Sequence, residues 1–358
     1  DVDQLSAKFI IRIIEDKLRL GFSDMTIIDA LSWTAAGDKS LRGKIEHAYN
    51  ICADIGLIAY TLKKEGITAI EKMEIHIAIP IRPAAAERIP SPEAVMEKLG
   101  NCIAQPKFDG FRLQIHIDNT KDKQIVEFFS RNLLDMSLMF PDLKKSFEKL
   151  PVKQLICEGE AIVFDKNTGQ FVPFQETVKR KRKHDVEEFA EQMPLEVYIF
   201  DILYFDGESL LDKTHNQRRA ILEKIFTKNK FKNIKVIEEK CIKNVAELKE
   251  YFLDELEKGL EGIVVKKPDS IYQPGKRNFN WIKLKKHSGS QLDDTLDCVI
   301  LGYYGGYGRR SDFGIGAFLV GIYNKKQDKF QTIAKVGTGL SDEQWKELKK
   351  KCDDLAVK

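Results

Sequence analysis

A lysine followed by Asp-Gly and then an arginine is the part of this sequence best suited to chemistry. Lys107 lies near the end of the strand-like run Ile103–Phe108, and Asp109-Gly110 is a turn signal. After the turn, Leu113–Ile117 alternates apolar and polar residues, as a half-buried strand does. The pattern predicts a hairpin that holds the Lys107 amine in a cleft. A surface hairpin with an ordinary lysine has the same local pattern.

Further apolar runs downstream also carry charged residues. They are Gln154–Cys157 with Glu158-Gly159-Glu160, Val197–Tyr204 around Asp201, Glu261–Lys266, and Trp281–Lys285. An unpaired charge is costly to bury, so charges within strand-like runs require a common explanation. Lys283 and Lys285 fall on one face of a strand. Charges that converge on one cleft predict a triphosphate and metal site, in which lysines neutralise phosphate and carboxylates hold a divalent cation or a ribose hydroxyl.

In this order and spacing, the segments resemble the motifs of the covalent nucleotidyltransferases. More narrowly, they are similar to ATP-dependent DNA ligases of the archaeal and eukaryotic replicative type. The similarity extends over nearly the whole chain and includes residues 174–183, 272–277 and 295–310. Five motifs in order are far more specific than one Lys-x-Asp-Gly-x-Arg match.

The resemblance implies an α+β multidomain protein. Residues 1–78 are expected to be the C-terminal part of a helical DNA-binding domain. Residues 79–290 are expected to form an adenylation domain of antiparallel sheets with helices. Residues 291–358 are expected to form an OB-type β-barrel that is incomplete, so the chain is expected to be truncated at both ends.

The resemblance also implies roles for single residues. Lys107 is the nucleophile that takes AMP from ATP. Glu160 and Glu261 are the carboxylates that face Mg²⁺, and Glu158 is either a further site residue or a solvated residue at a strand end. The nucleotide contacts are Gln105, Pro106, Arg112, Arg131, Glu160, Phe200, Lys266, Lys283 and Lys285.

Three of these contacts have more specific interpretations. Arg112 matches a ribose contact, and the alternative is a cross-strand salt bridge to a carboxylate. Phe200 would stack on adenine, or else it is a core residue. Gln105 stands where close relatives often have Glu. Because an amide both accepts and donates hydrogen bonds, looser selectivity for adenine is expected.

DNA contact is expected from basic residues outside the cleft. The net charge of +3 is too small to indicate nucleic-acid binding by itself, but Lys179–Lys183 is a run of cations. By the resemblance, the DNA-binding residues are Phe174, Arg180, Lys181, Arg182, Arg309 and Arg310. Such contacts hold the phosphate backbone and carry no base information. The alternatives are a solvated face for the basic run and a packing role for Phe174.

The predicted function is sealing of nicks in double-stranded DNA through a lysyl-AMP intermediate, with ATP and Mg²⁺ as cofactors. The alternatives are an RNA ligase or an mRNA capping guanylyltransferase, and a non-catalytic OB-type nucleic-acid-binding protein. A monomer is expected, and a sliding clamp is left open as a partner because no segment for one is visible.

The expected location is intracellular. Six scattered cysteines without a Cys-x-x-Cys pair favour reduced thiols over a zinc site. No apolar run in the sequence is long enough to span a membrane.

Overall fold

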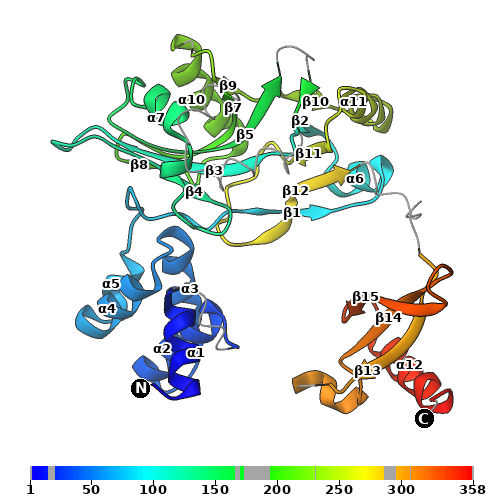
Figure 1. The fold of residues 1–358 in the computed structure, drawn as a ribbon. Coiled ribbons are helices and arrows are strands. Elements are labelled where there is room, and N and C mark those ends of the chain that lie inside the picture. The colour runs from blue at the N-terminus through cyan, green and yellow to red at the C-terminus, as the bar shows by residue number, and fades with distance from the viewer. Residues whose placement is uncertain are drawn as a thin grey trace. The chain divides into compact units, whose positions relative to one another are not determined.

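The computed structural model of the chain contains two compact units, residues 1–289 and residues 290–358. The residues that it describes are 2–14, 21–165, 170–172, 194–229, 231–285, 296–306 and 308–356. Among them, no helix has both the length and the apolar character needed to cross a membrane. Figure 1 shows that the larger unit contains a helical segment and, after it in the chain, sheets with helices packed against them, so the predicted α+β class is confirmed.

The first part of the larger unit is helical. Its helices are α1 (Gln4–Ile14), α2 (Asp24–Ala36), α3 (Arg42–Ile51), α4 (Ile55–Glu65) and α5 (Ile67–Glu71). Ser23 caps α2 in a capping box with Thr26, and the Asp54 side chain caps α4 by accepting from the Leu57 N–H at 2.9 Å. A cluster that includes the fully buried Ile28 and Ile45 holds α2 to α5 together.

A seven-stranded sheet forms one half of the domain that follows. Its main order is β4 (Ile125–Ser130), β3 (Phe111–Asp118), β5 (Gln154–Asp165), β7 (Leu195–Phe205) and β8 (Glu208–Ser209), with β6 (Gln170–Phe171) on β5 and β9 (Ile234–Val236) on β7. The 3₁₀ turn η1 (Ser137–Met139) follows β4 and contacts it. Helices α7 (Pro141–Phe147) and α10 (His215–Lys228) cover one face, where their apolar residues join those of β3, β4, β5 and β7 in one core.

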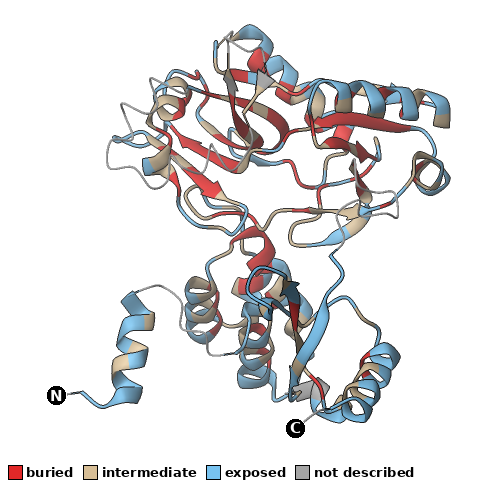
Figure 2. Ribbon diagram, turned by 45° about the vertical axis from the view of Figure 1, so that its right-hand side comes forward, coloured by how far each residue is buried: buried red, intermediate tan, exposed pale blue. Residues whose placement is uncertain are grey.

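A five-stranded sheet forms the other half. Its order is β1 (Ala85–Arg88), β12 (Arg277–Lys285), β11 (Gly262–Lys266), β2 (Cys102–Lys107) and β10 (Lys240–Ile242). Helices α6 (Pro92–Leu99) and α11 (Val245–Glu257) cover its outer face. A third core, which contains Phe108, Ile156 and Trp281, lies between the two sheets. Figure 2 shows the buried residues concentrated along these strands.

The predicted hairpin around Lys107 is wrong. β2 and β3 follow each other in the chain, but β2 pairs with β10 and β11, whereas β3 pairs with β4 and β5. Asp109-Gly110 therefore connects two sheets, as Figure 1 shows for β2 and β3. Local turn chemistry predicts a change of direction and cannot reveal which strands pair afterwards. The connection places Lys107 where the sheets face each other.

The smaller unit contains β13 (Val299–Tyr304), η4 (Gly308–Phe313), β14 (Ala317–Asn324), β15 (Lys329–Val336) and α12 (Asp342–Asp354). The strands form one antiparallel sheet in the order β13-β14-β15. The described residues of this unit contain no closed barrel, and the OB-type assignment stays a prediction. α12 begins at a capping box between Ser341 and Gln344 and buries Trp345.

The connection between the sheets predicts a strong effect of Gly110→Ala. An added Cβ would lie 2.5 Å from the Ala161 carbonyl oxygen of β5, closer than packing allows. We expect a loss of stability of about 1–3 kcal/mol, as for other overpacked sites. Urea unfolding measures the change. The control is Gly43→Ala in α3, where a new Cβ meets no atom within 4 Å. Equal unfolding midpoints for the wild type and the Gly110→Ala protein would contradict the expected clash.

Candidate active site

A cavity of about 470 Å³ lies between the inner faces of the two sheets. Every nucleotide-contact or metal-facing residue predicted from the sequence lines it. These are Gln105, Pro106, Lys107, Arg112, Arg131, Glu160, Phe200, Glu261, Lys266, Lys283 and Lys285. Six lining residues are Lys or Arg and three are Asp or Glu, so the lining has a surplus of positive charge.

Strand alternation explains how neighbouring residues divide between the cavity and the core. On β12, Trp281, Lys283 and Lys285 line the cavity, while Ile282 and Leu284 are fully buried on the other face. Gln105 and Lys107 are likewise two residues apart on β2 and line the same cavity. The sheet thus presents its polar residues on one side and packs its apolar residues under α6 and α11.

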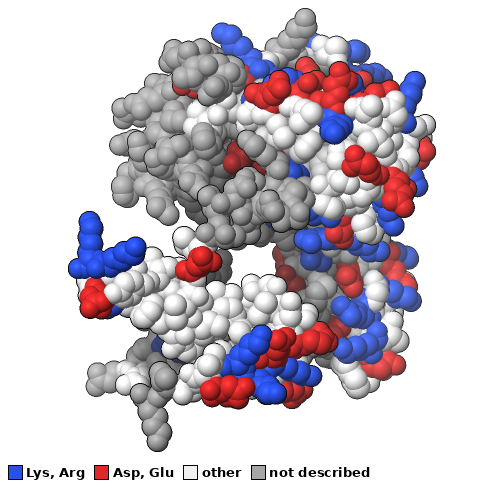
Figure 3. Space-filling model, turned by 90° about the vertical axis from the view of Figure 1, so that its right-hand side faces the viewer, with Lys and Arg blue, Asp and Glu red and all other residues white. Residues whose placement is uncertain are grey.

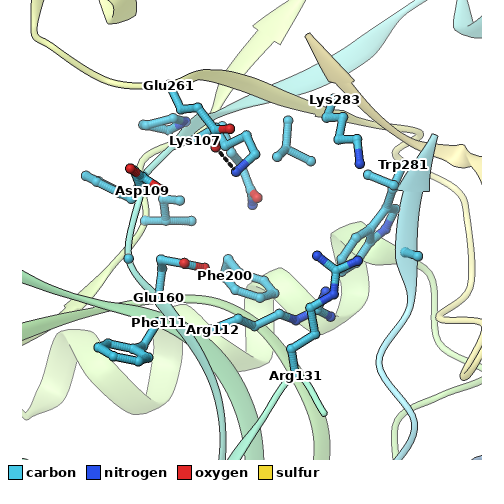
Figure 4. Close-up of a pocket in the computed structure, with 18 of the residues that line it drawn as sticks. Lys107, Asp109, Phe111, Arg112, Arg131, Glu160, Phe200, Glu261, Trp281 and Lys283 are labelled. Carbon is cyan, nitrogen blue, oxygen red and sulfur yellow. Dashed lines mark ion pairs between the residues drawn. The ribbon is translucent and has the colours of Figure 1, made fainter. Parts of the chain in front are cut away.

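The Lys107 ammonium group contacts the Glu261 carboxylate, and Lys285 pairs with the same carboxylate. Figure 4 shows the Lys107–Glu261 ion pair, with Glu160, Arg112 and Phe200 across the cavity from it. Burial lowers the pKa of Lys107, and the nearby Arg131 lowers it further, against the opposing effect of carboxylates. The shift favours the neutral amine, which is the nucleophilic form.

Glu160 lies on β5, and its side chain lines the cavity. Burial raises the pKa of Glu160 to about 7, although Lys107 and Arg112 favour the carboxylate. On the neighbouring strand β3, the residue paired with Glu160 is Arg112. A carboxyl group with such a pKa is partly protonated near neutral pH and gains its full charge when further cations approach.

Arg112 forms the cross-strand salt bridge that the sequence allowed as an alternative. Its Nη2 donates to both oxygens of Glu158, at 3.0 and 2.8 Å, and the Tyr272 hydroxyl donates to Glu158 at 2.9 Å. The interpretation of Glu158 as a solvated strand-end residue is wrong, because its side chain is 1% exposed. Arg112 Nε is buried without a hydrogen-bond partner among the described residues.

Phe200 and Trp281 form an aromatic wall of the cavity, with ring centres 6.2 Å apart. Lys266 Nζ lies 4.2 Å from the centre of the Trp281 ring and donates to the Phe200 carbonyl oxygen at 3.1 Å. Burial lowers the pKa of Lys266 to about 8. Asp201 does not line the cavity as the grouping of charged strands implied, because Arg218 binds its carboxylate at 2.7 and 3.0 Å.

Two family models match the chain. The model described as ATP dependent DNA ligase domain matches residues 83–285, and the model described as ATP dependent DNA ligase C terminal region matches residues 311–358. This chain belongs to the ATP-dependent DNA ligase family. Membership favours a DNA ligase over the capping-enzyme, RNA-ligase and non-catalytic alternatives.

Curated relatives agree with this family. "Probable DNA ligase" of Dictyoglomus thermophilum is 44% identical over 98% of this chain and 59% of its own length. "DNA ligase 2" of Thermofilum pendens is 39% identical over 100% of this chain and 59% of its own length. The chain thus spans 59% of the length of either relative. The solved structure Pmar-Lig_PreS3 has a TM-score of 0.56 and 20% identity, covers 96% of this chain and 67% of that chain, and supports the fold alone.

The cavity of this ligase-family chain has the donor types that suit Mg²⁺. Glu160 and Glu261 line it from opposite sheets. Mg²⁺ is commonly held by one or two carboxylates together with substrate phosphates, so these residues fit it. Among the described residues, no group of three or more His, Cys, Asp or Glu side chains is arranged as a metal cage. A metal here would depend on phosphate oxygens for the rest of its ligands.

The residues predicted to bind DNA are not tested by this structure. Phe174, Arg180, Lys181 and Arg182 lie outside the described residues. Arg309 and Arg310 belong to η4, but their side chains are not described. On the face seen in Figure 3, the described basic and acidic side chains are intermingled. Their DNA contacts therefore stay predictions.

Sequence reasoning missed several residues of the site. Trp281 could have been found, because it lies two residues before Lys283 on the same strand. Tyr272 donates a hydrogen bond to Glu158, the partner of Arg112, from 114 residues away, a contact that no spacing rule indicates. Glu239 accepts a hydrogen bond from Gln105 across 134 residues and follows no motif. Long-range partners of this kind are set by tertiary structure.

The raised pKa of Glu160 predicts a pH-dependent effect of Glu160→Gln on stability. Below the ordinary value of 4.5, both the folded and the unfolded chain keep the proton. Between 4.5 and about 7, only the unfolded chain loses it, so the stability of the wild type falls as pH rises. Gln has no proton to lose. We expect the melting temperature of the variant, relative to wild type, to be higher at about pH 8 than at about pH 5.

Glu257→Gln, at an exposed position of α11, is the control and should show no such trend. A difference between wild type and Glu160→Gln that is the same at both pH values would contradict the assigned shift.

Proposed function

We propose that this chain carries out the ligation chemistry of its family, with Lys107 as the residue that becomes adenylated. The observation that carries the proposal is the position of Lys107 in a cavity whose lining combines an aromatic wall with a surplus of cations. A purine fits against Phe200 and Trp281. A triphosphate fits the cations, because its negative charge offsets theirs.

In the first step, the neutral Lys107 amine attacks the α-phosphorus of ATP. A phosphorus–nitrogen bond forms, the bond to the bridging oxygen breaks, and pyrophosphate leaves. Lys283 and Lys285 lie on the β12 face beside Lys107 and stabilise the charge that develops on the phosphate oxygens. Arg112 and Glu160, which line the same cavity, hold the ribose.

The contact with Glu261 has two consequences for Lys107. The carboxylate holds the lysine side chain in place, and it stabilises the ammonium form, which cannot attack. An arriving phosphate competes for both Lys107 and Lys285 and so weakens this pair. Glu261 is then positioned to take the proton that the amine releases.

Mg²⁺ is the proposed metal, held by Glu160 and Glu261. When bound, it would offset charge on the phosphates. The side chains of the protein place the reacting groups, since phosphoryl transfer depends mostly on positioning and on electrostatic stabilisation.

Nicked double-stranded DNA is the proposed partner. AMP passes from Lys107 to the 5′-phosphate at the nick, and the 3′-hydroxyl then attacks that phosphate and expels AMP. Phe174, Arg180, Lys181, Arg182, Arg309 and Arg310 are the proposed DNA contacts. Residues 1–78, 79–290 and 291–358 are the proposed helical, adenylation and OB-type domains, and the chain is proposed to act as an intracellular monomer.

Lys107→Arg tests the nucleophile. Arginine keeps the charge that pairs with Glu261, but its guanidinium stays protonated and cannot attack phosphorus. We expect the wild type, incubated with ATP and Mg²⁺, to gain the mass of one covalent AMP, and the variant to gain none. Intact-protein mass spectrometry makes the measurement. Lys267→Arg, at an exposed position beside Lys266, should label normally. An AMP adduct on the Lys107→Arg protein would overturn the assignment.

Triple replacement of Arg180, Lys181 and Arg182 by Ala tests the DNA contact. Each lost phosphate contact should reduce the slope of log affinity against log salt by roughly 0.9, equally for nicks of different sequence. Filter binding across a salt series gives the slope. Replacing the exposed Lys121, Lys123 and Lys149 by Ala removes the same number of charges and should leave the slope nearly unchanged. An unchanged slope in the triple variant would mean that the cluster is only a solvated face.

A further inference from the structure

Gln105 lies two residues before Lys107 on β2 and is 2% exposed. Its side chain lines the cavity, and its Nε2 donates a hydrogen bond to Glu239 Oε1 at 2.5 Å. Glu239 lies just before β10 and is not among the residues that line the cavity. A residue outside the cavity thus holds one that faces it.

Glu239 is held as a carboxylate by its neighbours. His215 Nε2 lies 2.9 Å from Oε1, and Arg219 Nη1 lies 3.5 Å from the same oxygen. Burial alone would raise the pKa of Glu239, but His215, Lys266 and Arg219 hold it below its ordinary value. An ionised carboxylate only accepts hydrogen bonds.

The acceptor character of Glu239 determines the orientation of the Gln105 amide. Only the NH₂ end can face a carboxylate, so the carbonyl oxygen must point the other way. Among the described residues, this oxygen has no hydrogen-bond partner, and it is not one of the fully buried orphan atoms. It is therefore open to the cavity that Gln105 lines.

We propose that Glu239 is a positioning residue that sets nucleobase selectivity by making Gln105 an acceptor. This role rests on the proposed function. A carbonyl oxygen at this position accepts from a purine with an amino group at C6, as in adenine. It repels a purine with a carbonyl group there, as in hypoxanthine or guanine. Without the Glu239 contact, Gln105 could present either its carbonyl oxygen or its NH₂ group to the base, which is why looser selectivity was expected from the sequence. The Glu239 contact removes that freedom.

The test compares ATP with inosine triphosphate, which has a carbonyl group in place of the C6 amino group. The quantity measured is kcat/KM for formation of the covalent nucleotide adduct on Lys107. Mass spectrometry of the 358-residue chain detects the adduct. In Glu239→Gln, the amide at position 239 can accept or donate, so Gln105 can turn its NH₂ toward a carbonyl group. We expect use of inosine triphosphate to rise and the ATP preference to fall about tenfold or more. A site that was merely loosened would use ATP less well and would not use inosine triphosphate better, and this result would contradict the proposed role of Glu239.

A rescue experiment separates positioning from general damage. Gln105→Glu places two carboxylates against each other and should impair use of both nucleotides. Adding Glu239→Gln to that variant restores a donor opposite the new carboxylate, so the double variant should regain the ATP preference to within about threefold of wild type. Glu238→Gln, at the exposed neighbouring position, is the control and should behave as wild type.

A wild-type measurement applies even if a variant fails to fold. Purine riboside triphosphate lacks the C6 amino group, and the wild type should use it about tenfold or more less well than ATP. The role of Glu239 is overturned if the wild type uses the two equally, if Glu239→Gln keeps its selectivity, or if the double variant is no better than Gln105→Glu. Absence of any AMP adduct on wild type would instead overturn the proposed function, and this role with it.

Discussion

The constraint on which the site depends is the placement of several like charges in one partly buried cavity. Six lining cations face three lining carboxylates, and burial disfavours the ionised forms of Lys107, Glu160 and Lys266. The structure meets this cost with specific partners, such as Glu261 for Lys107 and Glu158 for Arg112. The remaining positive surplus suits a ligand with several negative charges. The charge balance of the empty cavity and the proposed affinity for a nucleotide triphosphate therefore have the same electrostatic origin.

The two-sheet architecture makes this arrangement possible. Each sheet packs one face under helices and turns the other toward the cavity. Strand alternation therefore places Lys283 in the cavity lining and Leu284 in the core under the helices. The short connection at Asp109-Gly110 takes the chain from one sheet to the other immediately after Lys107. Gly110 permits a close approach to Ala161 that a side chain would prevent. Lys107 is thus fixed between two strands that belong to different sheets.

The sequence predicted the α+β class, and every nucleotide contact that it predicted lines one cavity. This success came from motif residues at strand periodicity, such as Lys283 and Lys285. It failed where pairing is decided by the whole fold. Asp109-Gly110 has the local chemistry of a hairpin turn, but β2 and β3 belong to different sheets. Glu158 has the same local pattern whether solvated or buried, and only Arg112 and Tyr272 distinguish the two cases.

Two carboxylates behind the cavity wall share a physical role. Glu158 orients Arg112, and Glu239 orients Gln105, each through a carboxylate that only accepts hydrogen bonds. The Gln105 amide can both donate and accept, and the carboxylate behind it removes that ambiguity. Gln105 is left with its carbonyl oxygen toward the cavity. The polarity that a ligand meets is therefore determined by residues one layer behind the cavity wall. Comparison of sequence motifs does not identify those residues.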